Sequence, residues 1–275
     1  TKNMLTAGKA LPSIYGADSP KMNAADLRTS GYELSLSWRD MFKLAGKPFG
    51  YGVTATLSDY RSVITKYDNP EKSFADSYYE GKRIGEIWGF VVDGLFDSTE
   101  EAQAYAKEVD LGYFSKRLTG GWQGGDLKYV DLDGDGKISL GQNTVNNPGD
   151  RKIIGNSLAS LQYGFNFSFD WLGFDFNIFL QGTGNHYWYP TAENMQFWGP
   201  YSTPYTSFLP KNFLDNCWDE DNKDAYFPRP RAYAANSTVS PLGATNTRYL
   251  QNLRYLRLKS LTIGYTIPEK LTSKI

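Results

Sequence analysis

The stretch from Leu253 to Pro268, LRYLRLKSLTIGYTIP, constrains the fold of this chain more than any other. Bulky apolar side chains alternate there with polar ones, and a period of two places the two kinds on opposite faces of a β-strand. The alternation changes phase between Leu258 and Leu261, so we expect a β-bulge near Lys259 and Ser260 that keeps one continuous apolar face. Such a strand shows one face to an apolar medium and the other to water.

The same alternation predicts two antiparallel hairpins. The first joins strands at Gly31–Arg39 and Phe49–Ser58 through a polar turn at Lys43–Pro48. The second runs from Leu161 to Gly182 and turns tightly at Leu172–Gly173. Each arm of the second hairpin has the roughly 10 residues that a tilted strand needs to cross a bilayer.

The two faces of the second hairpin differ in chemistry. Phe165, Phe167 and Phe169 share one face, whereas the opposite face carries mainly Gly, Asn, Ser, Asp and Gln. A soluble sheet usually has more Lys and Glu on its solvent face, so neutral polar residues favour a wet lumen. The sequence therefore predicts an all-β fold, a transmembrane antiparallel β-barrel whose rings contact membrane lipid.

Two long polar stretches separate the predicted strands, about Asp59–Leu127 and Thr183–Asn252. Loops of this length are uncommon in compact soluble domains but are expected on the outer side of a membrane barrel. The first stretch contains a capping box at Ser98–Glu101, which predicts a helix that continues to Glu108.

Composition and motifs narrow the function. The formal net charge of -1 gives no basic stripe for nucleic acid. Cys217 is the only cysteine and His186 the only histidine, so neither a disulfide nor a histidine-based metal or catalytic site is expected. No catalytic motif is present, and we expect no enzyme activity. The chain does not begin with a signal-peptide pattern, and we interpret the chain as a piece of a longer polypeptide.

An Asp- and Gly-rich segment is the sharpest candidate for a metal site. Carboxylates at positions 1, 3 and 5, a glycine at position 6 and a backbone carbonyl at position 7 match the first half of an EF-hand Ca²⁺ loop. The bidentate glutamate expected at position 12 is Gln142 instead. The candidate Ca²⁺ ligands are Asp131, Asp133, Asp135, the carbonyl of Lys137, and Asp150 from further along the chain. The alternative is a structural turn without an ion.

A cluster of aromatic residues is the candidate ligand-binding site. Exposed rings stack on sugars and peptides, but they can equally pack a loop on itself or lie in the girdle at the membrane interface. The candidates are Tyr187, Trp188, Tyr189, Trp198 and Tyr201.

Several segments resemble SusC/RagA-type TonB-linked outer-membrane transporters. Gly125–Gly136, GDLKYVDLDGDG, resembles the family's GDIKYVDLNGDG signature, with Asp133 in place of the usual Asn. Tyr255–Pro268 resembles its YLRLKNLTLGYTLP block. Further similar segments lie in order along the chain: Leu11–Gly16, Pro20–Glu33, Gly85–Phe96, Asp150–Gly155 and Tyr163–Gly164. The stretch Lys137–Asn147 is longer than the usual family spacing.

The resemblance implies more than the residues themselves do. Residues 1–275 would be the C-terminal part of a TonB-dependent barrel of about 22 strands, without its plug domain and closing strands. Six to eight strands would form one wall. The parent would lie in the outer membrane of a Gram-negative bacterium and import oligosaccharides or peptides. Its expected partners are the TonB complex and a SusD-like surface lipoprotein.

Two other functions fit the sequence. A soluble carbohydrate-binding or glycosidase β-sandwich would also carry loops rich in Tyr and Trp. A surface adhesin or structural module could use the Asp-rich segment as a calcium brace. A membrane barrel would need detergent to stay in solution, and the other two would not.

Overall fold

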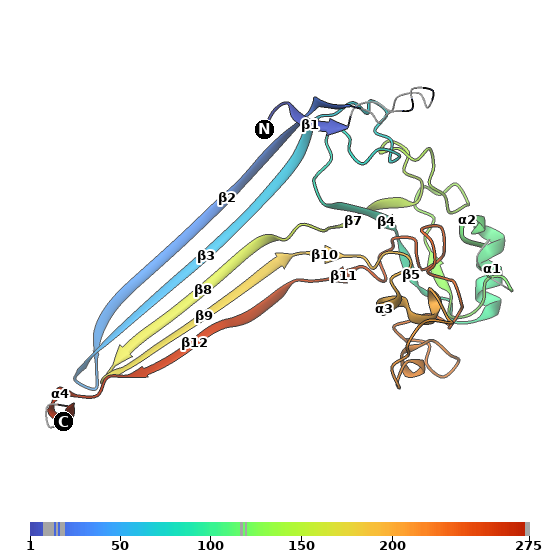
Figure 1. Ribbon diagram of the computed structural model, residues 1–275. Helices are drawn as coiled ribbons and strands as arrows, with labels where there is room; N and C mark the ends of the chain where they lie inside the picture. Colours follow the sequence, from blue (N-terminus) through green and yellow to red (C-terminus); the bar gives the residue numbers. More distant parts are fainter. Residues whose placement is uncertain (8–13, 15, 17–19, 116–117, 119, 273–275) are drawn as a thin grey trace.

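A six-stranded antiparallel sheet, here called the wall, dominates the structure, a computed structural model that describes residues 1–7, 14, 16, 20–115, 118 and 120–272. Its strands occur in the order β1 (Met4–Ala7), β2 (Lys21–Leu44), β3 (Lys47–Lys66), β8 (Ser160–Trp171), β9 (Phe174–Asn185) and β12 (Tyr255–Tyr265). Figure 1 shows the long strands side by side, with tight turns at one end and the remaining chain gathered at the other. Most of the Leu11–Gly16 segment lies outside the described residues.

Both predicted hairpins are present, and the first is longer than expected. β2 and β3 pair from Asp26–Lys66 down to Leu44–Lys47, around a turn at Ala45 and Gly46. Their lengths of 24 and 20 residues exceed the roughly 9–11 residues that span a bilayer. The hairpin therefore continues beyond the thickness of a membrane. Sequence alternation identified only its most regular part.

The second hairpin and the bulge confirm the predictions in detail. Leu172 and Gly173 have φ angles of 55° and 84°, the left-handed conformation that a two-residue turn between twisted strands requires. The pairing of β12 with β9 shifts register between Leu258 and Ser260. This bulge returns the apolar side chains of β12 to one face.

The cross-strand register assembles an apolar row and, beside it, a row that is polar except for Phe179. One row crosses five strands through Trp38, Val53, Phe167, Ile178 and Leu261, in which each residue is paired with the next. The adjacent row, on the opposite face, is Ser37, Thr54, Asn166, Phe179 and Ser260.

The described residues leave the apolar face of the wall uncovered. Trp38 and Leu36 are each 61% exposed, and Ile263 is 68% exposed. Aqueous solvent disfavours such a continuous patch of large apolar side chains, whereas hydrocarbon does not. The wall therefore has the exposed apolar face that a membrane β-barrel shows to lipid. It does not have the covered apolar face of a β-sandwich.

The stretches expected as polar loops instead fold around a hydrophobic core. We call the described residues between 67 and 159 and between 186 and 252 the loop region. Its buried residues include Phe96, Phe114, Tyr129, Trp198 and Tyr249. Phe114 and Tyr129 stack with ring centroids 4.3 Å apart. The long polar stretches therefore pack on themselves, because distant aromatic residues converge on one core.

Short elements frame this core. The sheets are β4 (Glu86–Phe90) with β7 (Arg151–Asn156), β5 (Val92–Leu95) with β6 (Leu127–Tyr129), and β10 (Tyr187–Trp188) with β11 (Gln251–Asn252). The helical elements are α1 (Thr99–Glu108), α2 (Gly112–Ser115), α3 (Met195–Trp198), η2 (Gly199–Tyr201), η3 (Leu214–Asn216) and, after the wall, α4 (Glu269–Thr272). Within the described residues, no helix combines the length and hydropathy needed to cross a bilayer.

The predicted helix begins as the capping box specifies. Ser98 is the N-cap of α1, and its Oγ accepts a hydrogen bond from the Glu101 backbone N–H at 3.2 Å. The Glu101 carboxylate accepts the backbone N–H of Asp97, one residue before the cap, at 2.7 Å. These bonds satisfy N–H groups at the helix start. The buried side of α1 at Ala102 then packs on the core.

Candidate functional site

The aromatic candidates separate into buried and accessible residues. Trp198 and Tyr201 are fully buried, and Tyr189 is 9% exposed. Their polar atoms also bond internally: Trp198 Nε1 donates to the Thr191 carbonyl at 3.0 Å, and the Tyr201 hydroxyl donates to the Pro228 carbonyl at 2.6 Å. Burial raises the pKa of Tyr201 and of Tyr189.

These contacts correct the prediction for three of the five rings. Trp198, Tyr201 and Tyr189 have no free face on which a ligand could stack, because they form the core of the loop region. Tyr187 and Trp188 differ. Trp188 is 40% exposed, and Tyr187 lines a cavity described below. For these two residues, ligand binding stays a prediction.

The environments of the sole cysteine and the sole histidine do not suggest a catalytic role. Cys217 is 2% exposed, and its thiol donates to the Phe213 carbonyl at 3.3 Å. Burial raises the pKa of this thiol, which makes it a poor nucleophile at neutral pH. His186 is half-buried just before β10, where its carbonyl accepts the Leu253 N–H at 2.8 Å.

The Asp-rich segment brings part of the predicted ligand set together. Carboxylate oxygens of Asp131, Asp133 and Asp150 lie within 4.8 Å of one another. Asp150 is fully buried although it is distant in sequence from the other two. Asp135 instead forms an ion pair with Lys137, with Oδ2 and Nζ 3.1 Å apart. Hard cations such as Ca²⁺ prefer clusters of carboxylate oxygens of this kind.

Backbone N–H groups donate hydrogen bonds to two of these carboxylates. Asp131 accepts bonds from Gly134 at 2.7 Å and from Gly136 at 2.8 Å. Asp150 accepts bonds from Leu132 and Ser139, each at 2.7 Å. The Asp150 side chain therefore closes the turn even without an ion.

Opposing effects set the pKa values of this cluster. Burial raises the pKa of Asp150, and its two N–H donors lower it less than burial raises it. At Asp131, burial also favours the neutral form, but the N–H donors outweigh it and the pKa is lowered. A bound cation would favour the charged form of both groups. Binding of Ca²⁺ by these residues stays a prediction.

A cavity of about 710 Å³ lies where the wall meets the loop region. β3 pairs with β8 only as far as Ser58 and Gln162. Beyond that point residues 81–84 replace β8 beside β3, with the Ile84 N–H donating to the Ser62 carbonyl at 2.9 Å. The space between this segment and β7 is the cavity.

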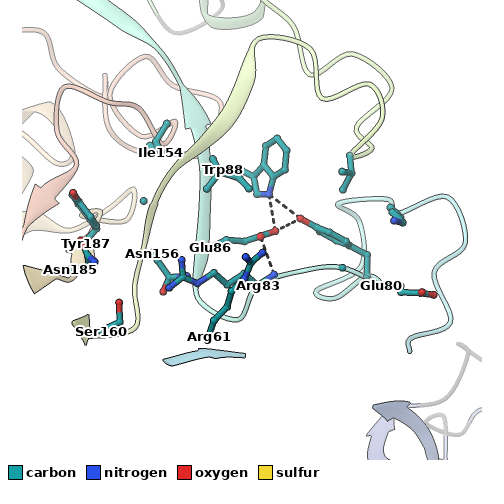
Figure 2. A pocket seen from close by; sticks show the side chains of 16 residues that line it. Arg61, Glu80, Arg83, Glu86, Trp88, Ile154, Asn156, Ser160, Asn185 and Tyr187 are labelled. Carbon is teal, nitrogen blue, oxygen red and sulfur yellow. Dashed lines mark hydrogen bonds between the residues drawn. The ribbon is translucent and has the colours of Figure 1, made fainter. Parts of the chain in front are cut away.

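Its lining combines charge, amides and rings. Figure 2 shows Arg61, Arg83 and Asn156 together in the view, with Glu86 and Trp88 on one side of them and Ser160 and Tyr187 on the other. The volume falls within the roughly 300–1,000 Å³ of small-molecule sites. Apart from Tyr187, sequence reasoning missed this site. The one available signal was the alternation of Glu86 and Trp88, which places both side chains on one face of a strand.

Comparisons with known proteins show which proteins the chain resembles in sequence. No known protein-family profile matches it. TonB-dependent receptor P3 of Formosa agariphila is 25% identical over 97% of this chain and 24% of the relative. TonB-dependent receptor P26 of the same bacterium is 23% identical over 97% of the chain and 25% of the relative. The chain thus spans about a quarter of the length of the curated relatives it matches.

Solved structures share its fold. The RagAB peptide transporter matches with a TM-score of 0.60 and 19% identity, over 99% of this chain and 26% of that chain. A second structure, the RagAB peptide importer in the closed-closed state, matches with a TM-score of 0.58, 19% identity, and coverage of 98% and 26%.

These findings confirm the resemblance stated from the sequence and the antiparallel, partial-barrel fold. They also confirm the expected location, the outer membrane of a Gram-negative bacterium. The relatives are named as receptors and transporters, and not as enzymes.

Proposed function

We propose that this chain, which resembles SusC/RagA-type TonB-linked transporters, forms one wall and the overlying loop region of a TonB-dependent nutrient importer. The apolar row from Trp38 to Leu261, uncovered on its face of the wall, carries the proposal. Lipid would cover that face, and the Ser37 to Ser260 row behind it would line a wet lumen. The turns at Ala45–Gly46 and Leu172–Gly173 would then lie on the periplasmic side, and the loop region outside the cell.

The edges of the wall support assignment to a larger barrel. β1 pairs with β2 only near Lys21–Ala25, so most of that edge of β2 has no strand partner among the described residues. The outer edge of β12 is likewise unpartnered there. Unpaired backbone groups are strongly unfavourable in hydrocarbon, so a membrane sheet must continue on both sides until it closes. We assign residues 1–275 to the C-terminal part of the barrel domain, with the plug and closing strands elsewhere in the protein.

The transport reaction needs no catalytic group. The importer would bind oligosaccharides or peptides in its lumen and loops and release them when TonB acts on the plug. A SusD-like surface lipoprotein would cover the outer mouth, as the family resemblance implies. The soluble β-sandwich is not favoured, because its core would require the exposed face of Trp38 and Ile263 to be covered.

Uptake measurements test this proposal. The gene encoding the full-length protein is deleted, and accumulation of labelled oligosaccharides and peptides is compared with that of the parent strain. We expect loss of uptake of at least one class, and the same loss when TonB is inactivated. Release of the protein from membranes by a high-salt wash without detergent would contradict the membrane assignment. Uptake of every tested nutrient at parental rates would contradict the importer function.

A further inference from the structure

Three cations line the cavity between the wall and the loop region, and no described carboxylate pairs with them. Arg61 comes from β3, Lys72 from the loop that follows it, and Arg83 from the segment that replaces β8. None of the three forms an ion pair within 4.0 Å of a carboxylate in the part of the chain that the structure describes. Unpaired cations are common on open surfaces, but Lys72 and Arg83 are half-buried here.

The acidic residues of the lining do not neutralise these cations locally. Glu86 accepts hydrogen bonds from the Tyr79 hydroxyl, from Trp88 Nε1 at 3.0 Å and from the Arg83 backbone N–H at 3.1 Å. Figure 2 shows these three bonds converging on the Glu86 carboxylate. Glu80 is the second acidic residue of the lining, and it is exposed. Three positive and two negative side chains leave the lining with an excess of one positive charge.

The rings beside the cations limit the shape of a ligand. Tyr187 packs so closely on Gly155 that a Cβ at Gly155 would lie 3.0 Å from the Tyr187 ring. Trp88 is fixed through its bonds to Glu86 and to the Tyr79 hydroxyl, the latter at 3.2 Å. The cavity thus offers fixed rings beside two guanidinium groups. Guanidinium groups bind carboxylates with two parallel hydrogen bonds, and rings pack on the apolar faces of sugars or side chains.

We propose that this cavity binds a carboxylate group of the imported ligand, through Arg61 and Arg83, while Tyr187 and Trp88 contact the body of the ligand. This inference rests on the proposed importer function. The cavity would bind acidic oligosaccharides, and peptides with a free C-terminus, more tightly than neutral ligands of the same size. Lys72 contributes positive charge; its Nζ lies 3.9 Å from the position of a Cβ at Gly81.

Matched probes test the carboxylate preference on the purified full-length protein. Trigalacturonate is compared with its methyl ester, and trialanine with trialanine amide, by isothermal titration calorimetry. A charge-assisted hydrogen bond corresponds to about tenfold or more in affinity, so we expect the charged member of at least one pair to bind about tenfold tighter. Arg61→Gln with Arg83→Gln should abolish that difference, and Arg61→Lys with Arg83→Lys should restore only part of it.

Lys152→Gln is the matched control, because Lys152 lies on β7 beside the lining residue Ile153 but is not itself part of the lining. It should leave the preference unchanged. Equal binding of charged and neutral probes, or binding of neither, would overturn the proposal. So would lipopolysaccharide that copurifies with the unaltered protein and is lost from the double Gln variant, since the site would then hold a lipid. Uptake assays report on the importer function separately, because they do not depend on this charge preference.

Discussion

The side-chain amides of Asn166 on β8 and Asn177 on β9 hydrogen-bond to each other in both directions. Each Nδ2 donates to the Oδ1 of the partner, at 3.3 Å and 3.2 Å. The pair lies on the face opposite Phe167, where Ser37 and Thr54 also bond through their hydroxyls at 3.0 Å. Neutral groups that satisfy one another suit the surface of a water-filled lumen.

Asn177→Ala tests whether water reaches this face. If the lumen is wet, water replaces the lost partner of Asn166, and the free energy of unfolding should fall by about 0.5 kcal/mol or less. If the pair were shielded from water, the orphaned amide would cost about 1–3 kcal/mol. Urea unfolding of the full-length protein in lipid vesicles measures the difference. A cost above about 1 kcal/mol would argue against a lumen-facing position.

Two neighbouring lysine substitutions test the assignment of the lipid face. Phe167→Lys places a charge in hydrocarbon and should cost about 2–4 kcal/mol near the middle of the bilayer. Ser168→Lys points to the opposite face and should cost much less, because water solvates the ammonium group there. Phe167→Leu keeps an apolar side chain and is the size control. Equal costs for the two lysine variants in vesicle-based unfolding would contradict the assignment.

Local sequence rules predicted the wall because its interactions are local and periodic. The turn at Leu172–Gly173 and the bulge between Leu258 and Ser260 both follow from a period of two. The apolar row through Val53 and Phe167 follows in turn from hairpin registers. The predicted strands of the first hairpin were too short at both ends, since β2 extends from Lys21 to Leu44 and β3 from Lys47 to Lys66.

The loop region could not be predicted in this way, since its contacts join residues far apart without any period. The Tyr129 hydroxyl donates to the carbonyl of Pro241, 112 positions further along the chain. Membership of a sequence cluster of aromatic residues made Trp198 and Tyr201 candidates for ligand binding, but burial shows that they build the core. The cavity also escaped sequence reasoning, because Arg61, Arg83 and Tyr187 come from separate segments. The prediction that Asp150 joins the Asp-rich segment was correct in its geometry, because its carboxylate lies close to those of Asp131 and Asp133.

A pair of tryptophan substitutions separates core from surface. Trp198→Ala removes a fully buried ring and should lower the stability of the loop region by about 3–5 kcal/mol. Trp188→Ala alters a ring that is 40% exposed and should cost far less. Limited proteolysis of the outer loops in intact cells measures the change. Equal resistance of the Trp198 variant and the unaltered protein would contradict the core assignment.

Calcium titration tests the Asp-rich turn. If Asp131, Asp133 and Asp150 bind Ca²⁺, the ion should protect the turn against protease, and chelator should remove that protection. Asp133→Asn would weaken the effect without disturbing the N–H bonds that Asp131 and Asp150 accept. Asp150→Ala should destabilise the turn with or without Ca²⁺, because it leaves the Leu132 and Ser139 N–H groups without their acceptor. Protection that does not depend on Ca²⁺ in the unaltered protein would make the turn purely structural.

The last prediction concerns pH and Asp126, a buried carboxyl in the loop region. Its Oδ1 lies 3.0 Å from Arg231 Nε, and its Oδ2 accepts the Gln123 N–H at 2.8 Å. Burial nevertheless outweighs these partners and raises the pKa of Asp126 from 3.8 to about 6. The folded protein therefore holds this proton more tightly than the unfolded chain does. Linkage then requires the free energy of unfolding to fall as pH rises from about 4 to about 6.

A shift of this size corresponds to on the order of 3 kcal/mol of local stability, present below pH 4 and lost by about pH 6. Hydrogen exchange of residues 122–127, corrected for the intrinsic pH dependence of exchange, measures the opening free energy. Asp126→Asn cannot titrate and should remove this slope while keeping a side chain of nearly the same shape. A free energy that rises over the same pH range would mean that the Arg231 ion pair dominates over burial. The pKa of Asp126 would then lie below 3.8 in the folded protein.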